Sequence, residues 1–269
     1  MATEQTFNFT DALGRLEAAE AWQTANAAAV FNAGDSAWML CSTALVLMMT
    51  LPGLALFYGG MAQVKNVLST VFQTFSITCL ISVLWFMMSY SLAFRLGSPV
   101  IGGADRFWLI GGHDSGNQYS PERIGVTTAH PLAPSIPETV FMMYQMTFAI
   151  ITAAIVCGSF AGNLTYQIKI TPHSVTPYTV LSAERMKFAS MLVFIFFWHF
   201  LVYCFVAHSE WSPDGFLFQA GTLDFAGGDV VHVCSGVSGM CFYDFFVIRK
   251  RCLSPVTGII AIFNETDEW

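Results

Sequence analysis

The chain has 269 residues, of which 55% are apolar and only 11% charged, whereas roughly a quarter of the residues in a globular domain carry charge. A soluble protein of this size needs more charge to cover its surface, so the composition excludes an ordinary water-soluble domain. The net charge is −7, and the one basic cluster is the triplet 249–251, so the sequence gives no support for nucleic-acid binding.

Four long stretches carry no charged residue, and each exceeds the roughly 20 residues that a helix needs to cross the hydrocarbon layer. We predict spans over 36–60, 66–94, 139–162 and 188–208. A fifth span over 227–248 is weaker by hydropathy, because it contains Asp229 and Asp244. The stretches are continuously apolar rather than alternating, which favours helices over a β-barrel. The predicted fold class is all-α, a polytopic membrane protein with about five transmembrane helices.

The connections between these spans indicate the orientation. Residues 1–34 are polar and lack the pattern of a cleaved signal peptide, 95–138 form a long connection, and 163–187 and 249–269 carry most of the basic residues. Basic residues gather on the cytoplasmic side of membrane proteins. We therefore expect 1–34 to be extracellular, 163–187 to be a cytoplasmic loop and 249–269 to be a cytoplasmic tail, in a protein of the plasma membrane.

The positions of the cysteines are typical of packing residues and not of disulfides or metal ligands. Six of them fall within predicted spans, and no CxxC pair occurs. We expect them to be small buried apolar residues and predict no disulfide framework, no metal site and no cofactor. The six are Cys41, Cys79, Cys157, Cys204, Cys234 and Cys241.

Two polar residues stand out in the fifth predicted span. An ionisable group inside a span is costly and is a functional candidate by default, which singles out His232. The alternative, a packing histidine bonded to a neighbouring carbonyl, is about equally supported by the span itself. Asp224 precedes Phe-Ala-Gly-Gly, and a carboxylate is favourable at a helix start. We expect Asp224 to be a structural cap rather than a ligand contact.

Aromatic residues near the ends of spans three and four admit two interpretations. Trp211 lies three residues after His208 and is either an interfacial anchor or, with His208, a cation site, since an indole face attracts a small cation. Tyr144 and Phe148 are four residues apart and share a helix face. Spacing alone makes them core or lipid-facing aromatics. His199 is interpreted as a packing residue.

Several motifs together resemble the ammonium transporter (Amt/Mep/Rh) family. The most specific is DFAGGDVVHVCSGVSGM at 224–240. Further similar stretches are DSAWMLCSTALVLMMTLPGLALFYGG at 35–60, KNVLSTVFQTF and LWFMMSYSLAF within 65–94, and SAERMKFASMLVF at 182–194. The resemblance covers most of 35–248 and corresponds to the amino-terminal half of the family.

The resemblance implies both a fold and residue roles. It implies a homotrimer of pores, each built from two halves of inverted topology, of which this chain holds the first. It implies that ammonium is recruited at an outer aromatic site, loses its proton, and crosses as NH₃, which is transport rather than enzyme catalysis. Trp211 matches the recruitment tryptophan, and Tyr144 and Phe148 match an aromatic pair stacked at the outer gate, with Gln145 between them. Asp224 matches the structural aspartate near the entrance, beside His208, and His232 matches the first of two pore histidines.

Three features depart from the family pattern. The stretch 163–181 interrupts a nearly continuous family sequence and contains Pro172 and Pro177, which disfavour a helix there. The family pattern fades after Met240 and is unmatched beyond about 248. Gln63 stands where the family often has arginine. Because half of the inverted repeat is absent, we expect the chain alone not to conduct ammonium.

Two other functions are considered. The chain is either an incomplete transporter or a non-conducting regulatory or inert fragment that associates with full-length subunits. A haem-binding membrane protein using His199, His208 or His232 is the third class. His199 and His208 are nine residues apart and face opposite ways on one helix, which weakens that possibility.

Overall fold

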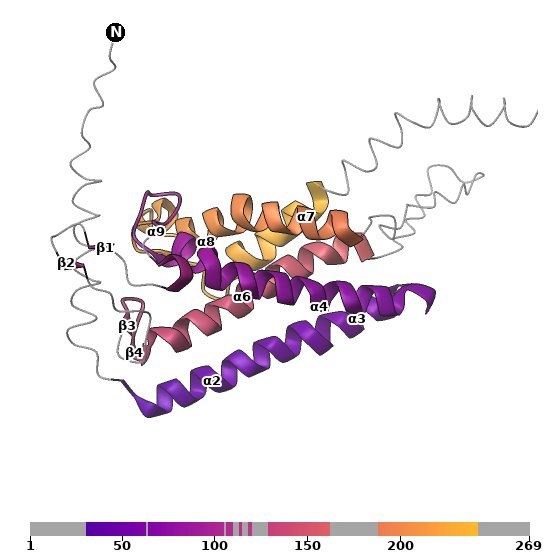
Figure 1. The fold of residues 1–269 in the computed structure, drawn as a ribbon, viewed down its shortest axis with the longest axis horizontal. Coiled ribbons are helices and arrows are strands. Elements are labelled where there is room, and N and C mark those ends of the chain that lie inside the picture. The colour runs from indigo at the N-terminus through magenta and orange to yellow at the C-terminus, as the bar shows by residue number, and fades with distance from the viewer. Residues whose placement is uncertain are drawn as a thin grey trace, which may run out of the picture.

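The computed structural model describes residues 31–62, 64–104, 106–109, 113–114, 118–119, 129–161 and 188–241. Four helical runs in this part are long and apolar enough to cross a membrane: Ala33–Met61, Val67–Phe94, Glu138–Gly158 and Phe188–Gln219. They lie lengthwise beside one another in one bundle (Figure 1). The all-α membrane class predicted from the sequence is confirmed. Residues 1–30 of the segment predicted to be extracellular, Gln63, the predicted loop 163–187 and the segments 242–248 and 249–269 lie outside the described residues.

The first run consists of α2 (Ala33–Met48), the π-helical turn η1 (Met49–Leu54) and α3 (Ala55–Met61). Asn32 caps its start, since the side-chain oxygen accepts from the backbone N–H groups of Gly34 and Asp35 at 2.7 and 3.3 Å. Pro52 lies within η1. Proline has no backbone N–H, so a widened turn at this point accommodates the missing helical hydrogen bond.

The second run begins after the 3₁₀ turn η2 (Val64–Asn66) and comprises α4 (Val67–Leu84), the π-helical turn η3 (Trp85–Ser89) and α5 (Tyr90–Phe94). Hydroxyl side chains in α4 bond the carbonyl four residues earlier. The donors are Thr70, Thr74, Ser76, Thr78 and Ser82. Each hydroxyl is thereby satisfied within its own helix, as a span surrounded by hydrocarbon requires.

The connection between the second and third runs carries short secondary structure. Its described residues contain the 3₁₀ turn η4 and four short strands, paired antiparallel as β1–β2 and β3–β4. Their bounds are η4 Phe107–Leu109, β1 His113–Asp114, β2 Gln118–Tyr119, β3 Ala129–His130 and β4 Ala133–Pro137. The N–H of Asn32 donates to the carbonyl of Ser135 at 2.8 Å. The start of α2 and the β3–β4 hairpin therefore share one end of the bundle, where the short helix α9 (Phe216–Gln219) also lies (Figure 1).

The third run is α6 (Glu138–Ala161). The fourth consists of α7 (Phe188–Trp198), the π-helical turn η6 (His199–Tyr203) and α8 (Cys204–Trp211), followed by the short α9 (Phe216–Gln219). The helix thus passes the predicted end at residue 208 by three residues. Glu210, in this extension, is buried within α8. After α9 come the π-helical turn η7 (Gly228–Val233) and a helix over 234–241, within the fifth predicted span.

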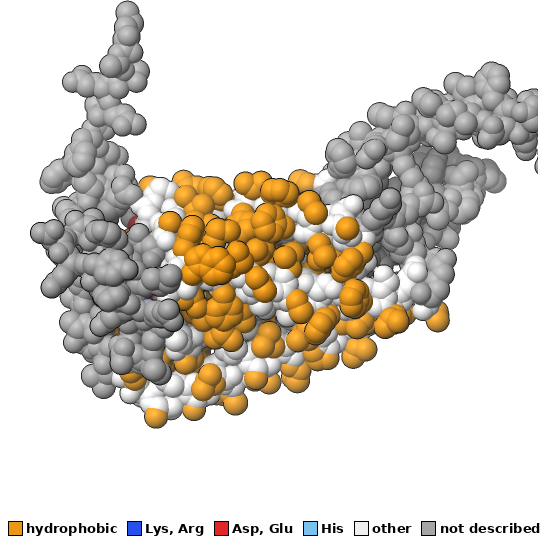
Figure 2. Space-filling model, in the orientation of Figure 1, with side chains coloured by type: hydrophobic (Ala, Val, Ile, Leu, Met, Phe, Trp, Pro, Cys, Tyr) orange, Lys and Arg blue, Asp and Glu red, His pale blue; other side chains and the backbone are white. Residues whose placement is uncertain are grey.

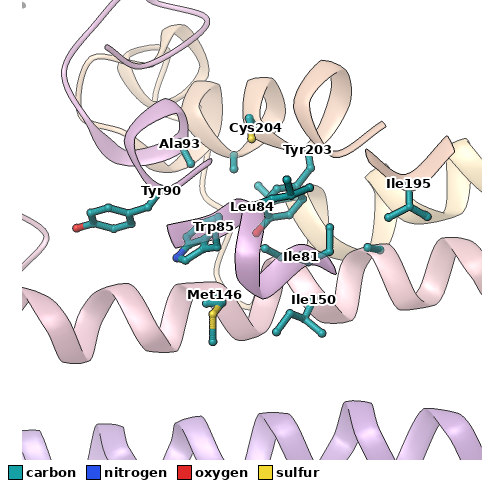
Figure 3. Close-up of a cluster of buried hydrophobic side chains, with 14 of the residues drawn as sticks. Ile81, Leu84, Trp85, Tyr90, Ala93, Met146, Ile150, Ile195, Tyr203 and Cys204 are labelled. Atoms are coloured by element: carbon teal, nitrogen blue, oxygen red, sulfur yellow. The ribbon is translucent and has the colours of Figure 1, made fainter. Parts of the chain in front are cut away.

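Trp85 lies at the centre of the core. Its ring is fully buried among side chains of the second, third and fourth runs, with Tyr203 at 6.4 Å between ring centroids (Figure 3). The indole N–H donates to the carbonyl of Met142 in α6 at 3.1 Å. A buried indole with its donor satisfied fixes α6 against η3. In the same way, the indole of Trp198 donates to the hydroxyl of Ser238 at 2.9 Å and ties α7 to the helix 234–241.

The outer face of the bundle is apolar. Figure 2 shows hydrophobic side chains spread over the described helices, and the exposed ones include Trp38, Leu56, Leu68 and Leu201. A face of this kind suits hydrocarbon rather than water. The expectation that the six cysteines are buried is wrong for three of them: Cys41, Cys79 and Cys241 are exposed, whereas Cys157, Cys204 and Cys234 are buried. Apolar residues of a membrane helix occupy lipid-facing positions as readily as core positions, so hydropathy does not separate the two.

Candidate functional site

Trp211, the last residue of α8, joins several aromatic rings from other helices. Its ring is stacked on Phe94 of α5, with 6.2 Å between ring centroids and 16° between planes. Phe148 of α6 meets it edge to face at 6.1 Å and 74°. The structure therefore brings together Trp211 and Phe148, two of the residues selected from the sequence. Phe94 was not selected, because it is 117 positions from Trp211 and lies in an apolar run without a distinguishing pattern.

Tyr144 extends this aromatic cluster along α6. Its ring meets Phe148 edge to face, with 4.9 Å between centroids and 85° between planes. The family resemblance implies stacked rings, whereas these two rings meet edge to face. The two side chains leave the same helix face one turn apart, which brings the rings into contact without making their planes parallel. Gln145 is partly buried, and its side-chain oxygen has no hydrogen-bond partner among the described residues.

Asp224 connects the aromatic cluster to the start of η7. Its carboxylate accepts from the backbone N–H groups of Asp229 and Val230 at 3.2 and 3.4 Å, which are the contacts of a helix cap. The same carboxylate accepts from the indole N–H of Trp211 at 3.0 Å. A single carboxylate therefore fixes both the helix start and the orientation of the indole.

Gly227 makes this turn possible. It adopts φ of 70°, a left-handed conformation that costs glycine nothing, and a Cβ there would lie 3.2 Å from Cγ2 of Val231 and 3.8 Å from the Trp211 ring. The chain thus passes close to the indole between Asp224 and η7.

His232 lies in η7 with an exposed side chain. The next residues on the same helix face, Val233, Val237 and Met240, are also exposed. The imidazole is therefore at the surface of the described part of the chain and not inside its core, where Val230, Val231 and Cys234 from the opposite side of the same segment are buried.

The remaining histidines of the fourth run are separate from the aromatic cluster. Both ring nitrogens of His208 contact backbone carbonyls, so the cation site that pairs His208 with Trp211 is not formed, and neither nitrogen is placed to bind haem iron. His199 is fully buried and packs parallel to Tyr203 at 5.3 Å between centroids. This is the packing position expected from the sequence.

Comparison with known proteins decides the family. The Ammonium Transporter Family matches the chain over residues 37–176 and 161–254. The chain belongs to this family. The two matched segments overlap at residues 161–176, which lie mostly within the interrupted stretch 163–181. The second segment ends at residue 254, beyond the point near 248 where the sequence resemblance was expected to end.

Individual ammonium transporters support the same assignment. The ammonium transporter of Bacillus subtilis is 42% identical over 219 residues, which cover 81% of this chain and 44% of the bacterial protein. Ammonium transporter 1 of Schizosaccharomyces pombe is 33% identical over 233 residues, 85% of this chain and 39% of that protein. This chain therefore spans less than half the length of these relatives.

The fold is also that of solved ammonium-transporter structures. Crystal structures of Mep2 from Candida albicans and from Saccharomyces cerevisiae match with TM-scores of 0.57 and 0.55 at 27% identity. The match covers 79% and 78% of this chain but only 39% and 40% of theirs. The predicted relation to the amino-terminal half of ammonium transporters is thus supported by both sequence and fold.

Proposed function

We propose that this member of the Ammonium Transporter Family recruits ammonium at the cluster of Trp211, Phe148 and Tyr144. The contact between Trp211 and Phe148, with the indole fixed by Asp224, carries the proposal. An aromatic face attracts a small cation by about 0.5–2 kcal/mol. Because Asp224 holds the indole by its N–H edge, the indole face turned away from Phe94 is left for the cation.

His232 would act after recruitment. A bare cation pays a large desolvation cost in an apolar path, so ammonium would give its proton to a neutral imidazole and cross as NH₃. A neutral imidazole offers both a hydrogen-bond donor and an acceptor, which suit NH₃ and proton relay. The exposed position of His232 supports this role, because a residue that lines a path between two halves is uncovered on either half alone. Only N–H bonds are broken or formed, so the process is transport and not enzyme catalysis.

The setting of the proposed function follows from the family and the sequence. We place the protein in the plasma membrane, with its amino terminus outside, as one subunit of a homotrimer. The apolar outer face of the bundle supports contact with lipid (Figure 2). The described residues supply the recruitment cluster and one wall of the path, and the second wall belongs to the other half of the inverted repeat.

Recruitment is tested by titrating the full chain in detergent micelles with ammonium chloride while recording the ¹H–¹⁵N signal of the Trp211 indole. Trp211→Phe assigns the signal. A saturable shift with ammonium, and none with sodium chloride at the same ionic strength, is expected. Equal responses to the two salts would rule out a cation site at the indole.

Transport is tested in cells that lack ammonium uptake. We expect the chain alone to give no growth on low ammonium, because His232 is uncovered. The second candidate, a non-conducting fragment that associates with complete transporters, is favoured by the exposed face of His232, Val233, Val237 and Met240. Co-expression with a complete transporter separates the two, since reduced uptake indicates association and unchanged uptake excludes it.

A further inference from the structure

His208 occupies an unusual hydrogen-bonding position at the end of α8. Its side chain is fully buried. Nδ1 lies 3.1 Å from the carbonyl oxygen of Ala93, and Nε2 lies 2.8 Å from the carbonyl oxygen of Ser98. Both distances are those of hydrogen bonds, and both partners are backbone oxygens that only accept.

The chemistry of imidazole makes this arrangement informative. A neutral imidazole carries one N–H donor and one lone pair, so it satisfies one carbonyl and turns its lone pair toward the other. Only the imidazolium cation donates from both nitrogens. His130 provides the contrast: its Nδ1 accepts from the N–H of Leu132 at 3.2 Å, and its Nε2 faces the carbonyl of Phe94 at 3.3 Å. That pattern of one donor and one acceptor suits a neutral ring.

A negative charge lies next to His208. Oδ1 of Asp214 is 3.5 Å from Nε2, and the Asp214 side chain is almost fully buried. The carboxylate also accepts from the hydroxyl of Ser212 and from the N–H of Gly97, both at 2.6 Å. A buried carboxylate that accepts from neutral donors still needs a counter-charge, and a cationic His208 supplies it.

The surrounding backbone favours the same charge. Ala93 is in the last turn of the helical run that ends at Phe94, and the carbonyl end of a helix attracts a cation. The elements packed against α8 include α5, α6, η6, α9 and η7. Their titratable side chains, together with those of α8 and of the neighbouring residues 95 and 212–227, are Tyr90, Arg95, Glu138, Tyr144, Cys157, His199, Tyr203, Cys204, Glu210, Asp214, Asp224, Asp229 and His232. Of these, Asp214 is the one for which the described residues show an ion-pair contact with His208.

We infer that His208 is an imidazolium paired with Asp214 and that this pair positions Trp211. The N–H of Ser212 donates to the carbonyl of His208 at 3.1 Å, and Gly215 packs against the His208 and Ser209 carbonyls. The residues that follow Trp211, from Ser212 to Gly215, are thus held against the backbone of His208 and include its ion-pair partner Asp214. The role of Trp211 rests on the proposed function, whereas the protonation of His208 does not.

The inference is tested by ¹⁵N NMR of the full chain labelled at histidine, in detergent micelles at about pH 8, where an unperturbed imidazole is neutral. We expect a histidine whose two ring nitrogens both give protonated-type signals, and we expect His208→Gln to remove it. A wild-type spectrum without such a histidine at that pH would overturn the inference, and this outcome needs no variant to fold. A signal of this kind that persists in His208→Gln would also overturn it.

Two further variants separate charge from packing. Asp214→Asn keeps the shape but removes the counter-charge, so we expect loss of the doubly protonated signal and a shift of the Trp211 indole signal. Ser212→Ala removes one hydrogen bond to Asp214 without changing any charge, and we expect the doubly protonated signal to remain. If Asp214→Asn leaves both signals unchanged, the pair does not position Trp211. Absence of ammonium binding at Trp211 would instead count against the proposed function alone.

Discussion

The indole nitrogen of Trp211 and the carboxylate of Asp224 lie 3.0 Å apart, in a hydrogen bond that joins the end of the fourth helical run to the segment before the fifth. The two residues are 13 positions apart, with α9 between them. Asp224 also accepts from the first backbone N–H groups of η7, so the position of the aromatic cluster and the start of the segment that carries His232 are set by one side chain. Loss of Asp224 is therefore expected to affect both features together.

Asp224→Ala is expected to lower the free energy of unfolding in detergent micelles by about 1–3 kcal/mol, because a capping carboxylate and a partly buried side-chain hydrogen bond are lost. Asp224→Asn is the matched control, since it retains one acceptor oxygen and should cost less. Trp211→Phe keeps an aromatic ring against Phe148 but loses the indole N–H. If Asp224→Ala and Asp224→Asn were equally stable, the carboxylate contacts would not contribute as described.

Gly227→Ala is expected to destabilise the protein through both conformation and contact. Its φ of 70° costs an L-residue about 1–2 kcal/mol, and the added Cβ would lie 3.2 Å from Val231. Gly221→Ala is the control for conformation, because its φ is 84° and no atom lies within 4 Å of a Cβ. Gly236→Ala is the control for a helical site with open space and should be neutral or stabilising by up to about 1 kcal/mol. In thermal unfolding, Gly227→Ala should be the least stable variant. An equal loss of stability in Gly221→Ala would show that the contact with Val231 does not contribute.

Local features of this fold could be predicted from the sequence, and long-range ones could not. Charge-free stretches located the helical runs to within a few residues, because the hydrocarbon layer imposes its length on each span. The cap at Asp224 was readable from the glycines that follow it. The bonds of His208 were not, because Ala93 and Ser98 are 115 and 110 positions away and offer only backbone carbonyls. Phe94 and the three exposed cysteines were missed for a related reason, since an apolar residue does not reveal whether it faces core or lipid.

His130 is expected to make stability depend on pH. It is fully buried in the connection before α6, and burial lowers its pKa from 6.5 to about 3. Because the folded pKa lies below the unfolded one, the unfolded chain binds more protons between these values. Stability is then fully present above about pH 6.5 and falls on acidification towards about pH 3, by at most about 1.4 kcal/mol per pH unit.

The variant His130→Phe tests this dependence, because it keeps the parallel packing on Phe141, where the ring centroids are 4.3 Å apart. Its unfolding midpoint should vary less with pH between about 6.5 and 4 than that of the wild type. An unaltered slope in His130→Phe would show that another group accounts for the acid sensitivity.

Glu138, the first residue of α6, is fully buried. Its two partners determine how much stability is lost when its carboxylate is replaced. Glu138 lies 3.5 Å from the guanidinium of Arg106 and accepts from the hydroxyl of Tyr90 at 2.9 Å. Glu138→Gln still accepts from Tyr90 but removes the charge that balances Arg106. Breaking a buried ion pair costs about 3–5 kcal/mol, whereas losing one hydrogen bond to a charged group costs about 1.5–3 kcal/mol.

Glu138→Gln should therefore destabilise the protein more than Tyr90→Phe, which removes the hydrogen bond and leaves both charges in place. The comparison requires both variants in the same detergent and at the same pH, since membrane-protein stability depends on its solvent. A larger loss in Tyr90→Phe would mean that the hydroxyl, and not the ion pair with Arg106, keeps Glu138 at its buried position. The order of the two losses thus separates charge balance from hydrogen bonding at the point where the long connection enters the third span.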